Sequence, residues 1–325
     1  MEELATLLAS EEPGVILVPE ALFDGRRTGA DIVLENTCPV PCNDGSNQTT
    51  YTALSSEQTC TELLVPIERD ERRLFTGPNK TIVGLGRGAR LRGVWLTIDQ
   101  TANVIVRNLA FYDVNPEIIE AGDGVSINAS SRVWLDHLTF RWIGDGFVDV
   151  TAGSTDVTLS WLHFDGRSEF ACAGRHPRAN ELSDAVATIH HSFYDRVNGR
   201  APTVNRSLAL VHVLNDLVSD DPDFGVASTC GAEVLLEGTY FESVAFPTTR
   251  RGCSDDPAPG SILARANAYD DASGPHQLSG ADSEEPRDPV RVMPYAYSVD
   301  DANDVRFTVR ERAGAGSRWA QPFEL

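Results

Sequence analysis

Three aspartates and one arginine in the middle of the chain have the types and spacing that chemistry could use. Asp145 and Asp149 are four residues apart, with a glycine beside the first and apolar residues between them. This pattern predicts a turn that leads into a strand, because Val148 is β-branched and favours extended backbone. In a coiled stack of strands, residues about 25 apart in sequence lie side by side. Asp123 is therefore expected to join this pair.

Three clustered carboxylates repel one another, and each raises the pKa of the others. A hard cation that takes oxygen ligands relieves this repulsion, and calcium is the usual one in proteins. The cluster therefore predicts a calcium site formed by Asp123, Asp145 and Asp149. The alternative is three solvated surface aspartates, which is the commoner situation for any one of them taken alone.

The elements that must position these residues follow from the periodicity of the apolar residues. Glu2 to Ser10 carries leucines at helical spacing, which predicts a short amphipathic helix. Residues 14–19 predict a strand, whereas residues 37–76 are polar, rich in turns and without a strong period, so we interpret them as an irregular insertion. From Lys80 onward the sequence has short apolar strands, and from Val104 their starts lie about 22 to 30 residues apart, the repeat length of a solenoid. These strands begin at Thr81, Val94, Val104, Val133, Val157, Ala187, Leu208 and Val234.

Aromatic residues follow several of these strands at a corresponding position, as do Phe111, Phe140, Phe164 and Phe193. Stacked coils would bury them in one continuous core, because a single coil cannot bury its own apolar face. The pattern predicts an all-β fold, a right-handed single-stranded parallel β-helix with a short N-terminal capping helix. A β-sandwich would need stricter alternation and frequent hairpin turns, and a leucine-rich repeat would need its own leucine spacing. Neither pattern is present in the sequence.

The length and net charge of the chain limit the possible domain organisation and the possible classes of partner. We interpret residues 1–325 as a single domain, with a cap and insertion over residues 1–75 and β-helix coils and loops over residues 76–316. The formal net charge of −21 argues against nucleic acid as a partner, because phosphate binding needs clustered cations. It would also repel an acidic polymer unless metal ions and local arginines reverse the field. No apolar run of about 18 residues indicates a membrane span.

Six cysteines are compatible with disulfides in an exported protein. Cys230–Cys253 is the favoured pair, because these two residues would bracket one coil and its loop. A zinc site at Cys38 and Cys42 is a weaker alternative, since no second paired motif follows. The first residues are acidic rather than basic, so no signal peptide is visible. A secreted, extracellular location is nevertheless expected.

Several short segments carry motifs in a fixed order along the chain. They are residues 79–86, residues 103–109, Val133-Trp134-Leu135-Asp136-His137, His190-His191, Arg200-Ala201-Pro202, residues 231–241 and residues 313–316. Together these segments resemble the signature segments of pectate lyases of polysaccharide lyase family 1. The resemblance covers about residues 76–316.

This resemblance implies a parallel β-helix that binds Ca²⁺ and cleaves polygalacturonate by β-elimination. It implies that Asp123, Asp145 and Asp149 bind the calcium and that Arg200 abstracts the C5 proton of galacturonate. Calcium would neutralise the charge that proton removal places beside the sugar carboxylate. An alkaline pH preference follows, because arginine side chains are ordinarily protonated at neutral pH. The expected partner is an acidic polysaccharide, polygalacturonate or pectin, without nucleic acid or membrane, and the protein is expected to be a monomer.

Four other motif residues are interpreted as structural. Asp136 and His137 are expected to be hydrogen-bonded inside the stack. His190 and His191 admit a metal site, but packed histidines with hydrogen-bond partners are the favoured interpretation.

The chain departs from the family pattern at two basic positions. Asn205 stands where a second motif arginine is expected, so either the next residue, Arg206, binds substrate in its place or the contact is lost. Glu169 falls where a substrate-binding lysine is expected, and Arg175 is the favoured replacement among nearby arginines that include Arg167.

Two other functions remain open beside a calcium-dependent pectate lyase. A pectin lyase would act on methyl-esterified polymer without calcium, but such relatives lose the acidic residues that this chain keeps. A non-catalytic β-helix that binds polysaccharide is the other alternative, and the retained arginine and aspartates favour an enzyme over it.

Overall fold

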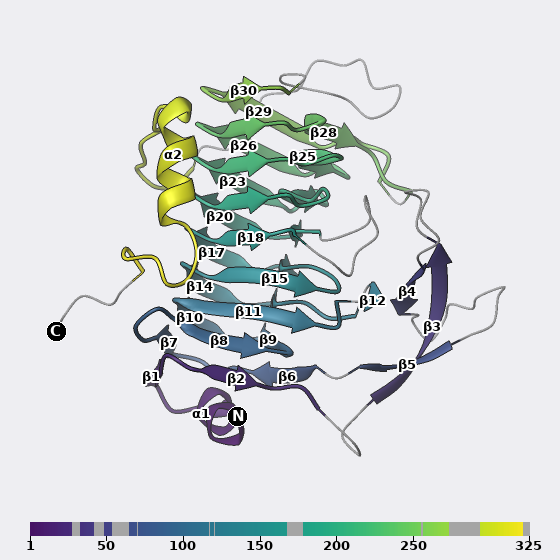
Figure 1. The fold of residues 1–325 in the computed structure, drawn as a ribbon. Helices are drawn as coiled ribbons and strands as arrows, with labels where there is room; N and C mark the ends of the chain where they lie inside the picture. Colours follow the sequence, from purple (N-terminus) through teal and green to yellow (C-terminus); the bar gives the residue numbers. More distant parts are fainter. Residues whose placement is uncertain are drawn as a thin grey trace.

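The protein is a stack of parallel strands that coil around one elongated core (Figure 1). The computed structural model describes residues 1–27, 33–41, 49–53, 65–69, 71–116, 118–119, 121–167, 178–254, 256–272 and 293–320. Eight coils each contribute one strand to each of three long sheets, which we call sheets I, II and III, and the last described coil contributes to sheets I and II only. The expected right-handed parallel β-helix is confirmed.

The three sheets are parallel throughout. Sheet I contains β1 Gly14–Val18, β7 Lys80–Gly84, β10 Ala102–Arg107, β14 Ser131–Asp136, β17 Thr155–Ser160, β20 Val186–His190, β23 Leu210–Leu214, β26 Glu233–Glu237 and β29 Ser261–Arg265. Sheet II contains β2 Leu22–Asp24, β8 Ala89–Arg92, β11 Leu109–Val114, β15 Thr139–Ile143, β18 His163–Asp165, β21 Phe193–Asp195, β24 Leu217–Ser219, β27 Tyr240–Glu242 and β30 Ala268–Asp270. Sheet III contains β6 Arg72–Phe75, β9 Val94–Asp99, β13 Val125–Asn128, β16 Val148–Thr151, β19 Asn180–Ser183, β22 Thr203–Asn205, β25 Phe224–Thr229 and β28 Phe246–Arg251.

In its described residues the insertion after the first strands is not irregular, which corrects the expectation for residues 37–76. It contains β3 Val33–Pro41, β4 Thr49–Ala53 and β5 Val65–Arg69, which pair antiparallel. A short strand of the stack, β12 Ile118–Ile119, adds to the edge of this small sheet. Threonines and valines favour extended backbone, and antiparallel pairing satisfies it without any solenoid period. The first coil is therefore β1, β2 and β6, with this sheet inserted between β2 and β6.

Aromatic rings form a continuous column in the core, as the sequence predicts, but the fourth ring is Tyr194 and not Phe193, which stands in register with His163. Phe111, Phe140, Phe164 and Tyr194 stand in register on four successive strands of sheet II. The ring centroid of Phe140 lies 5.5 Å from that of Phe111 and 5.6 Å from that of Phe164. All four side chains are fully buried. Their contact across coils provides the apolar burial that a single coil lacks.

Asparagines allow the tight turns between sheets I and II. Asn108 and Asn215 both adopt a φ of 57°, a left-handed conformation that asparagine tolerates better than most residues. The Asn108 side-chain amide also donates to the Gly84 carbonyl of the preceding coil at 2.7 Å. The Asn108 side chain thus satisfies a backbone group that the sharp turn leaves without a strand partner.

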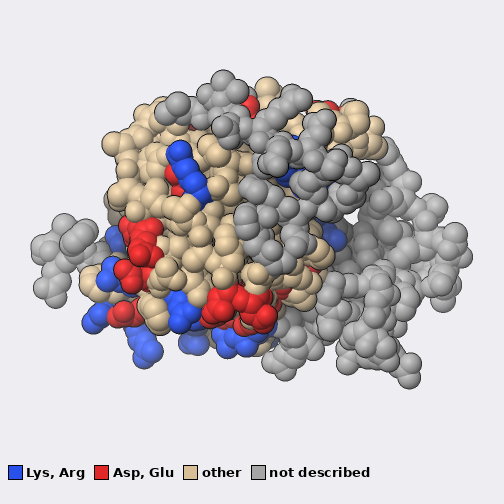
Figure 2. Space-filling view, turned by 90° about the horizontal axis from the view of Figure 1, so that it is seen from above, with Lys and Arg blue, Asp and Glu red and all other residues tan. Residues whose placement is uncertain are grey.

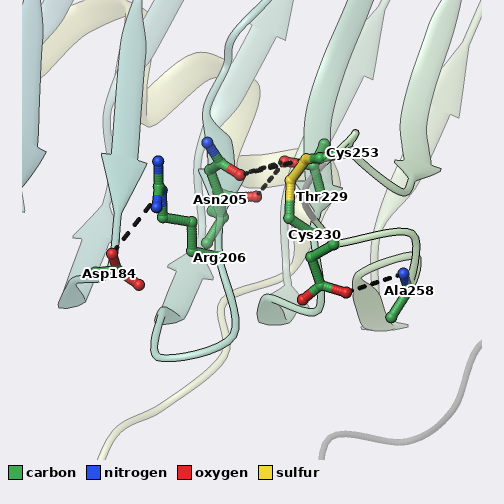
Figure 3. Close-up of a disulfide and its surroundings, with 9 residues drawn as sticks. Asp184, Asn205, Arg206, Thr229, Cys230, Cys253 and Ala258 are labelled. Atoms are coloured by element: carbon green, nitrogen blue, oxygen red, sulfur yellow. Dashed lines mark hydrogen bonds and ion pairs between the residues drawn. A yellow bond between two sulfur atoms is a disulfide. The ribbon is translucent and has the colours of Figure 1, made fainter.

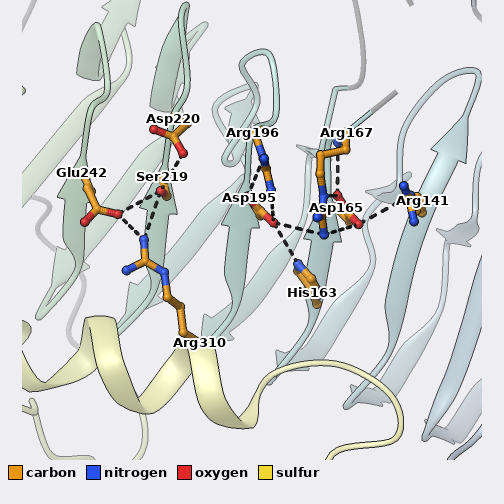
Figure 4. Close-up of polar contacts among 10 residues, drawn as sticks. All are labelled: Arg141, His163, Asp165, Arg167, Asp195, Arg196, Ser219, Asp220, Glu242 and Arg310. Carbon is orange, nitrogen blue, oxygen red and sulfur yellow. Dashed lines mark hydrogen bonds and ion pairs between the residues drawn. The ribbon is translucent and has the colours of Figure 1, made fainter. Parts of the chain in front are cut away.

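Two helices cover parts of the stack in the described residues. The predicted capping helix, α1 Glu2–Ala9, is confirmed and buries Leu4 and Leu8 against the first coil. The second helix, α2 Ala302–Arg312, was not predicted, and it runs alongside the strands (Figure 1). Its Arg310 contacts Ser219 and Glu242 on sheet II (Figure 4). Neither helix of the described part is long and apolar enough to cross a bilayer.

Arginine and carboxylate side chains lie next to one another on the described surface. Figure 2 shows such neighbouring red and blue groups along one edge of the face seen from above. On sheet II, Asp165 pairs with Arg167 at 2.7 Å and with Arg141 at 3.6 Å (Figure 4). Many arginines of this acidic chain thus form ion pairs with neighbouring carboxylates.

Candidate functional site

The turns that lead from sheet II into sheet III carry the predicted chemical residues. Asp123 lies in the turn before β13, Asp145 in the turn before β16, and Arg200 in the turn before β22. Asp149 is itself on β16, where it pairs in register with Ser126 of β13. Parallel stacking therefore places these residues on nearby coils along one edge of the β-helix.

Backbone contacts hold the two acidic turns together. The Asp145 N–H donates to the Gly122 carbonyl at 3.2 Å, and the Gly124 N–H donates to the Gly146 carbonyl at 3.1 Å. A side chain at residue 146 would collide with the Asp149 carboxylate, because a Cβ there would lie 2.3 Å from Oδ1. The glycine beside Asp145 thus makes room for the carboxylate of Asp149.

The pKa of Asp149 is shifted by burial and by neighbouring carboxylates. Burial raises the pKa of Asp149 well above its ordinary value, and the negative charges of Asp123, Asp145 and Glu181 raise it further. A hydrogen bond of 3.1 Å from the Glu181 N–H to Oδ1 opposes this shift. The aspartates are therefore not three independent solvated groups, and the repulsion that the sequence predicts is present.

Asp123 and Asp149 accept hydrogen bonds from separate donors. Asp123 accepts from the Ser126 hydroxyl, which in turn accepts from the Trp95 indole at 2.6 Å. Among the described residues, no three His, Cys, Asp or Glu side chains converge on one point as metal ligands do. The donor chemistry nevertheless suits a hard cation, since carboxylate oxygens on adjacent coils repel each other without one.

Glu181 is the site residue that sequence reasoning missed. It stands beside Asp149 in register on the next strand, β19, and its Oε2 lies 2.9 Å from Nη1 of Arg200. Both side chains are partly buried. Periodicity did not reveal this neighbour, because 32 residues separate Glu181 from Asp149, more than the spacing between paired residues in the adjacent coils.

The backbone that carries Arg200 is fixed by a buried carboxyl group. Gly199 and Arg200 adopt φ angles of 81° and 58°, and the Gly199 N–H donates to Oδ1 of Asp221 at 3.1 Å. The Arg200 carbonyl accepts from the Asn180 N–H at 2.8 Å. Burial raises the pKa of Asp221 to about 7, against hydrogen bonds from Asp223 and Gly199 that lower it.

The predicted substrate-binding arginines lie elsewhere or outside the described residues. Arg206 follows β22, at the opposite end of that strand from Arg200, and its Nε lies 3.9 Å from Asp184 (Figure 3). Asn205, before it, accepts from the Thr229 hydroxyl at 3.1 Å. Arg175 and Glu169 fall outside the described residues, and Arg167 is paired with Asp165 on sheet II.

The predicted disulfide is confirmed next to this end of the stack. Cys230 and Cys253 are bonded, with their Cα atoms 5.3 Å apart, and they join the turn after β25 to the segment after β28 (Figure 3). Cys42 lies outside the described residues, so the zinc alternative at Cys38 and Cys42 is not tested.

A second polar cluster occupies sheet I, away from the acidic turns. Asp136 accepts from His137 Nδ1 and from the Ser160 hydroxyl, each at 2.7 Å, and Arg107 Nε lies 2.7 Å from it. Burial opposes ionisation, but His137, Ser160 and Arg107 outweigh it and lower the pKa of Asp136. The expectation of a hydrogen-bonded pair inside the stack is confirmed. The cluster borders a cavity of about 380 Å³.

The paired histidines are packed beside this cluster. The Nδ1 atoms of His190 and His191 lie 2.9 Å apart in a hydrogen bond, and His191 stacks on Trp161. Burial, followed by the neighbouring His191, lowers the pKa of His190 to about 4, so its ring is neutral at physiological pH. This confirms the favoured interpretation of packed histidines.

Comparison with known proteins identifies similar sequences and folds. A family model described as pectate lyase matches residues 68–318. "Probable pectin lyase F-2" of Aspergillus terreus is 29% identical over 272 residues, which are 77% of this chain and 54% of that protein. The chain thus spans about half the length of the first curated relatives that it matches.

Two solved structures show the same fold at low sequence identity. A pectate lyase (pelN) from Paenibacillus sp. 0602 superposes with a TM-score of 0.69 and 17% identity, covering 94% of this chain and 87% of that one. Pectate Lyase C from Erwinia Chrysanthemi, studied with Ca²⁺, gives a TM-score of 0.60 and 19% identity, covering 78% and 77% of the two chains.

Proposed function

Because this chain belongs to the pectate lyase family, we propose that it is a calcium-dependent pectate lyase that cleaves polygalacturonate by β-elimination. The products would be unsaturated oligogalacturonides. The observation that carries this proposal is the mutual repulsion of Asp123, Asp145 and Asp149 on the same edge as Arg200. Such a set offers oxygen ligands to a hard cation beside a strong base.

Each residue has a separate task in this mechanism. Asp123, Asp145 and Asp149 would hold Ca²⁺, and bound calcium would supply positive charge next to the sugar carboxylate. Arg200 would take the C5 proton of the galacturonate unit. The electron pair left at C5 would then form the C4–C5 double bond as the C4–oxygen bond breaks, and the oxygen of the released sugar would take a proton from water. Arg206 and Arg175 remain proposals for binding sugar carboxylates.

A pectin lyase is the second candidate, because the first curated relatives that the chain matches are named pectin lyases. Such an enzyme would act on methyl-esterified polymer without calcium. Glu181 is compatible with this alternative, since a negative charge beside Arg200 disfavours a free uronate more than its neutral ester. The acidic residues around Asp149 support the pectate lyase instead.

The absorbance of unsaturated uronides distinguishes the candidates. Polygalacturonate and methyl-esterified pectin would each be incubated at alkaline pH with calcium or with a chelator. We expect product from polygalacturonate only with calcium, and none from the Arg200→Ala variant. Arg196→Ala is the matched control, because Arg196 lies in the same turn but pairs with Asp195 on sheet II. Product from esterified pectin without calcium would establish the second candidate, and no product from either polymer would refute both and leave a polysaccharide-binding protein.

We also propose that the protein is secreted. The disulfide between Cys230 and Cys253 supports this location, because such bonds persist mainly in oxidising compartments.

A further inference from the structure

Glu181 lies between the two halves of the candidate site. On one side it neighbours Asp149, and its backbone N–H donates to the Asp149 carboxylate at 3.1 Å. On the other side its own carboxylate pairs with Arg200, with 2.9 Å between Oε2 and Nη1. The Glu181 side chain therefore contacts Arg200, while its backbone stands in register with Asp149 of the acidic cluster.

This position creates a competition for one carboxylate. In the structure Glu181 stabilises the charged guanidinium of Arg200 through a charge-assisted contact. This contact occupies the guanidinium group, which would have to face the substrate. A cation beside Asp149 would attract the same carboxylate, since hard cations take several oxygen ligands and gain affinity with the number of charged ones.

We propose that Glu181 couples cation binding to the release of Arg200. When Ca²⁺ occupies the acidic residues, the Glu181 carboxylate leaves Arg200 and becomes a further oxygen ligand. The guanidinium is then free to face the substrate. This inference rests on the calcium site of the proposed function. It adds Glu181 as a further ligand, which is paired with Arg200 when no cation is bound.

The competition has a thermodynamic consequence that does not depend on activity. If the cation releases Arg200, then Arg200 must weaken cation binding by holding Glu181, because coupling between two binding events is reciprocal. Removing Arg200 should therefore tighten calcium binding, and this gain should require Glu181. A purely additive effect of charge would give the same gain with or without Glu181.

Calorimetric titration with calcium chloride tests this on four proteins: the wild type, Glu181→Gln, Arg200→Gln and the double variant. We expect Glu181→Gln to weaken calcium binding by about tenfold or more. Arg200→Gln should tighten it by about fivefold in the wild-type background. In the Glu181→Gln background the same change should stay within about twofold. Equal gains from Arg200→Gln in both backgrounds would overturn the proposal.

A matched control separates ligation from net charge. Asp184 follows the same strand, β19, and pairs with Arg206 at 3.9 Å, so Asp184→Asn removes an arginine-paired carboxylate one residue beyond the strand. It should change calcium affinity by less than about twofold, because Asp184 stands three residues beyond Glu181 along an extended strand, about 10 Å away, where salt screens the interaction. A wild type that binds no calcium would refute the calcium site itself. A wild type that binds calcium and a Glu181→Gln variant that binds equally well would refute only the coupling. Melting temperatures without calcium report whether each variant folds.

Discussion

The buried carboxyl group of Asp221 offers a quantitative test of how the turn that carries Arg200 is held. Asp221 is 0% exposed, and its Oδ1 accepts from the N–H groups of Gly199 at 3.1 Å and of Asp223 at 2.9 Å. Burial raises its pKa from 3.8 to about 7. The folded protein therefore retains a proton that the unfolded chain releases over this range of pH.

The sign and size of the effect on stability follow from this difference. Below pH 3.8 the carboxyl group is protonated in both states and costs nothing. As the pH rises toward 7, the unfolded state gains from ionisation and the free energy of unfolding falls by about 1.4 kcal/mol per pH unit. The total loss is about 4 kcal/mol, and it is complete above the folded-state pKa.

Asp221→Asn removes the titration and keeps one oxygen acceptor. We expect the variant to gain stability relative to the wild type as the pH rises from 4 to 8, by up to about 4 kcal/mol. Urea unfolding at each pH measures this difference. Asp220→Asn is the control, because the neighbouring Asp220 is exposed, and its difference from the wild type should be small at every pH. A difference for Asp221→Asn that is constant from pH 4 to 8 would refute the reasoning.

Three further perturbations test the scaffold by urea denaturation. Reducing the Cys230–Cys253 disulfide, whose cysteines are 23 residues apart, should lower the free energy of unfolding by about 3 kcal/mol, and an unchanged midpoint would contradict this. Phe140→Ala empties a fully buried position between two stacked rings and should cost about 3–5 kcal/mol, with Phe140→Leu as the milder control. Asp136→Ala removes a buried carboxylate with three polar partners and should cost about 3 kcal/mol, so a loss below about 1 kcal/mol would argue against that network.

The fold was predictable from the sequence because each coil repeats the same local solution. Apolar strands at a nearly constant interval, with Phe111, Phe140 and Phe164 at matching positions, leave few ways to bury their side chains other than a stack. The insertion was predicted less well, because its strands pair antiparallel with one another and need no period. Helix α2 was missed, although Val305 and Val309 are spaced for one buried helical face and Asp301 caps its first turn.

For the candidate site, too, some features were predictable from the sequence and others depended on the tertiary structure. The sequence by itself determined the residue types, and its repeat predicted that the three aspartates would lie near one another, whereas the role of Arg200 was implied by the family resemblance. The identity of their partners depended on the tertiary structure. Glu181 stands beside Asp149 because β19 pairs with β16 in a register that joins residues 32 apart in sequence. It reaches Arg200 because β19 lies between β16 and β22. Periodicity encodes which strands stack, whereas the length of each turn and the packing around it decide which side chains meet.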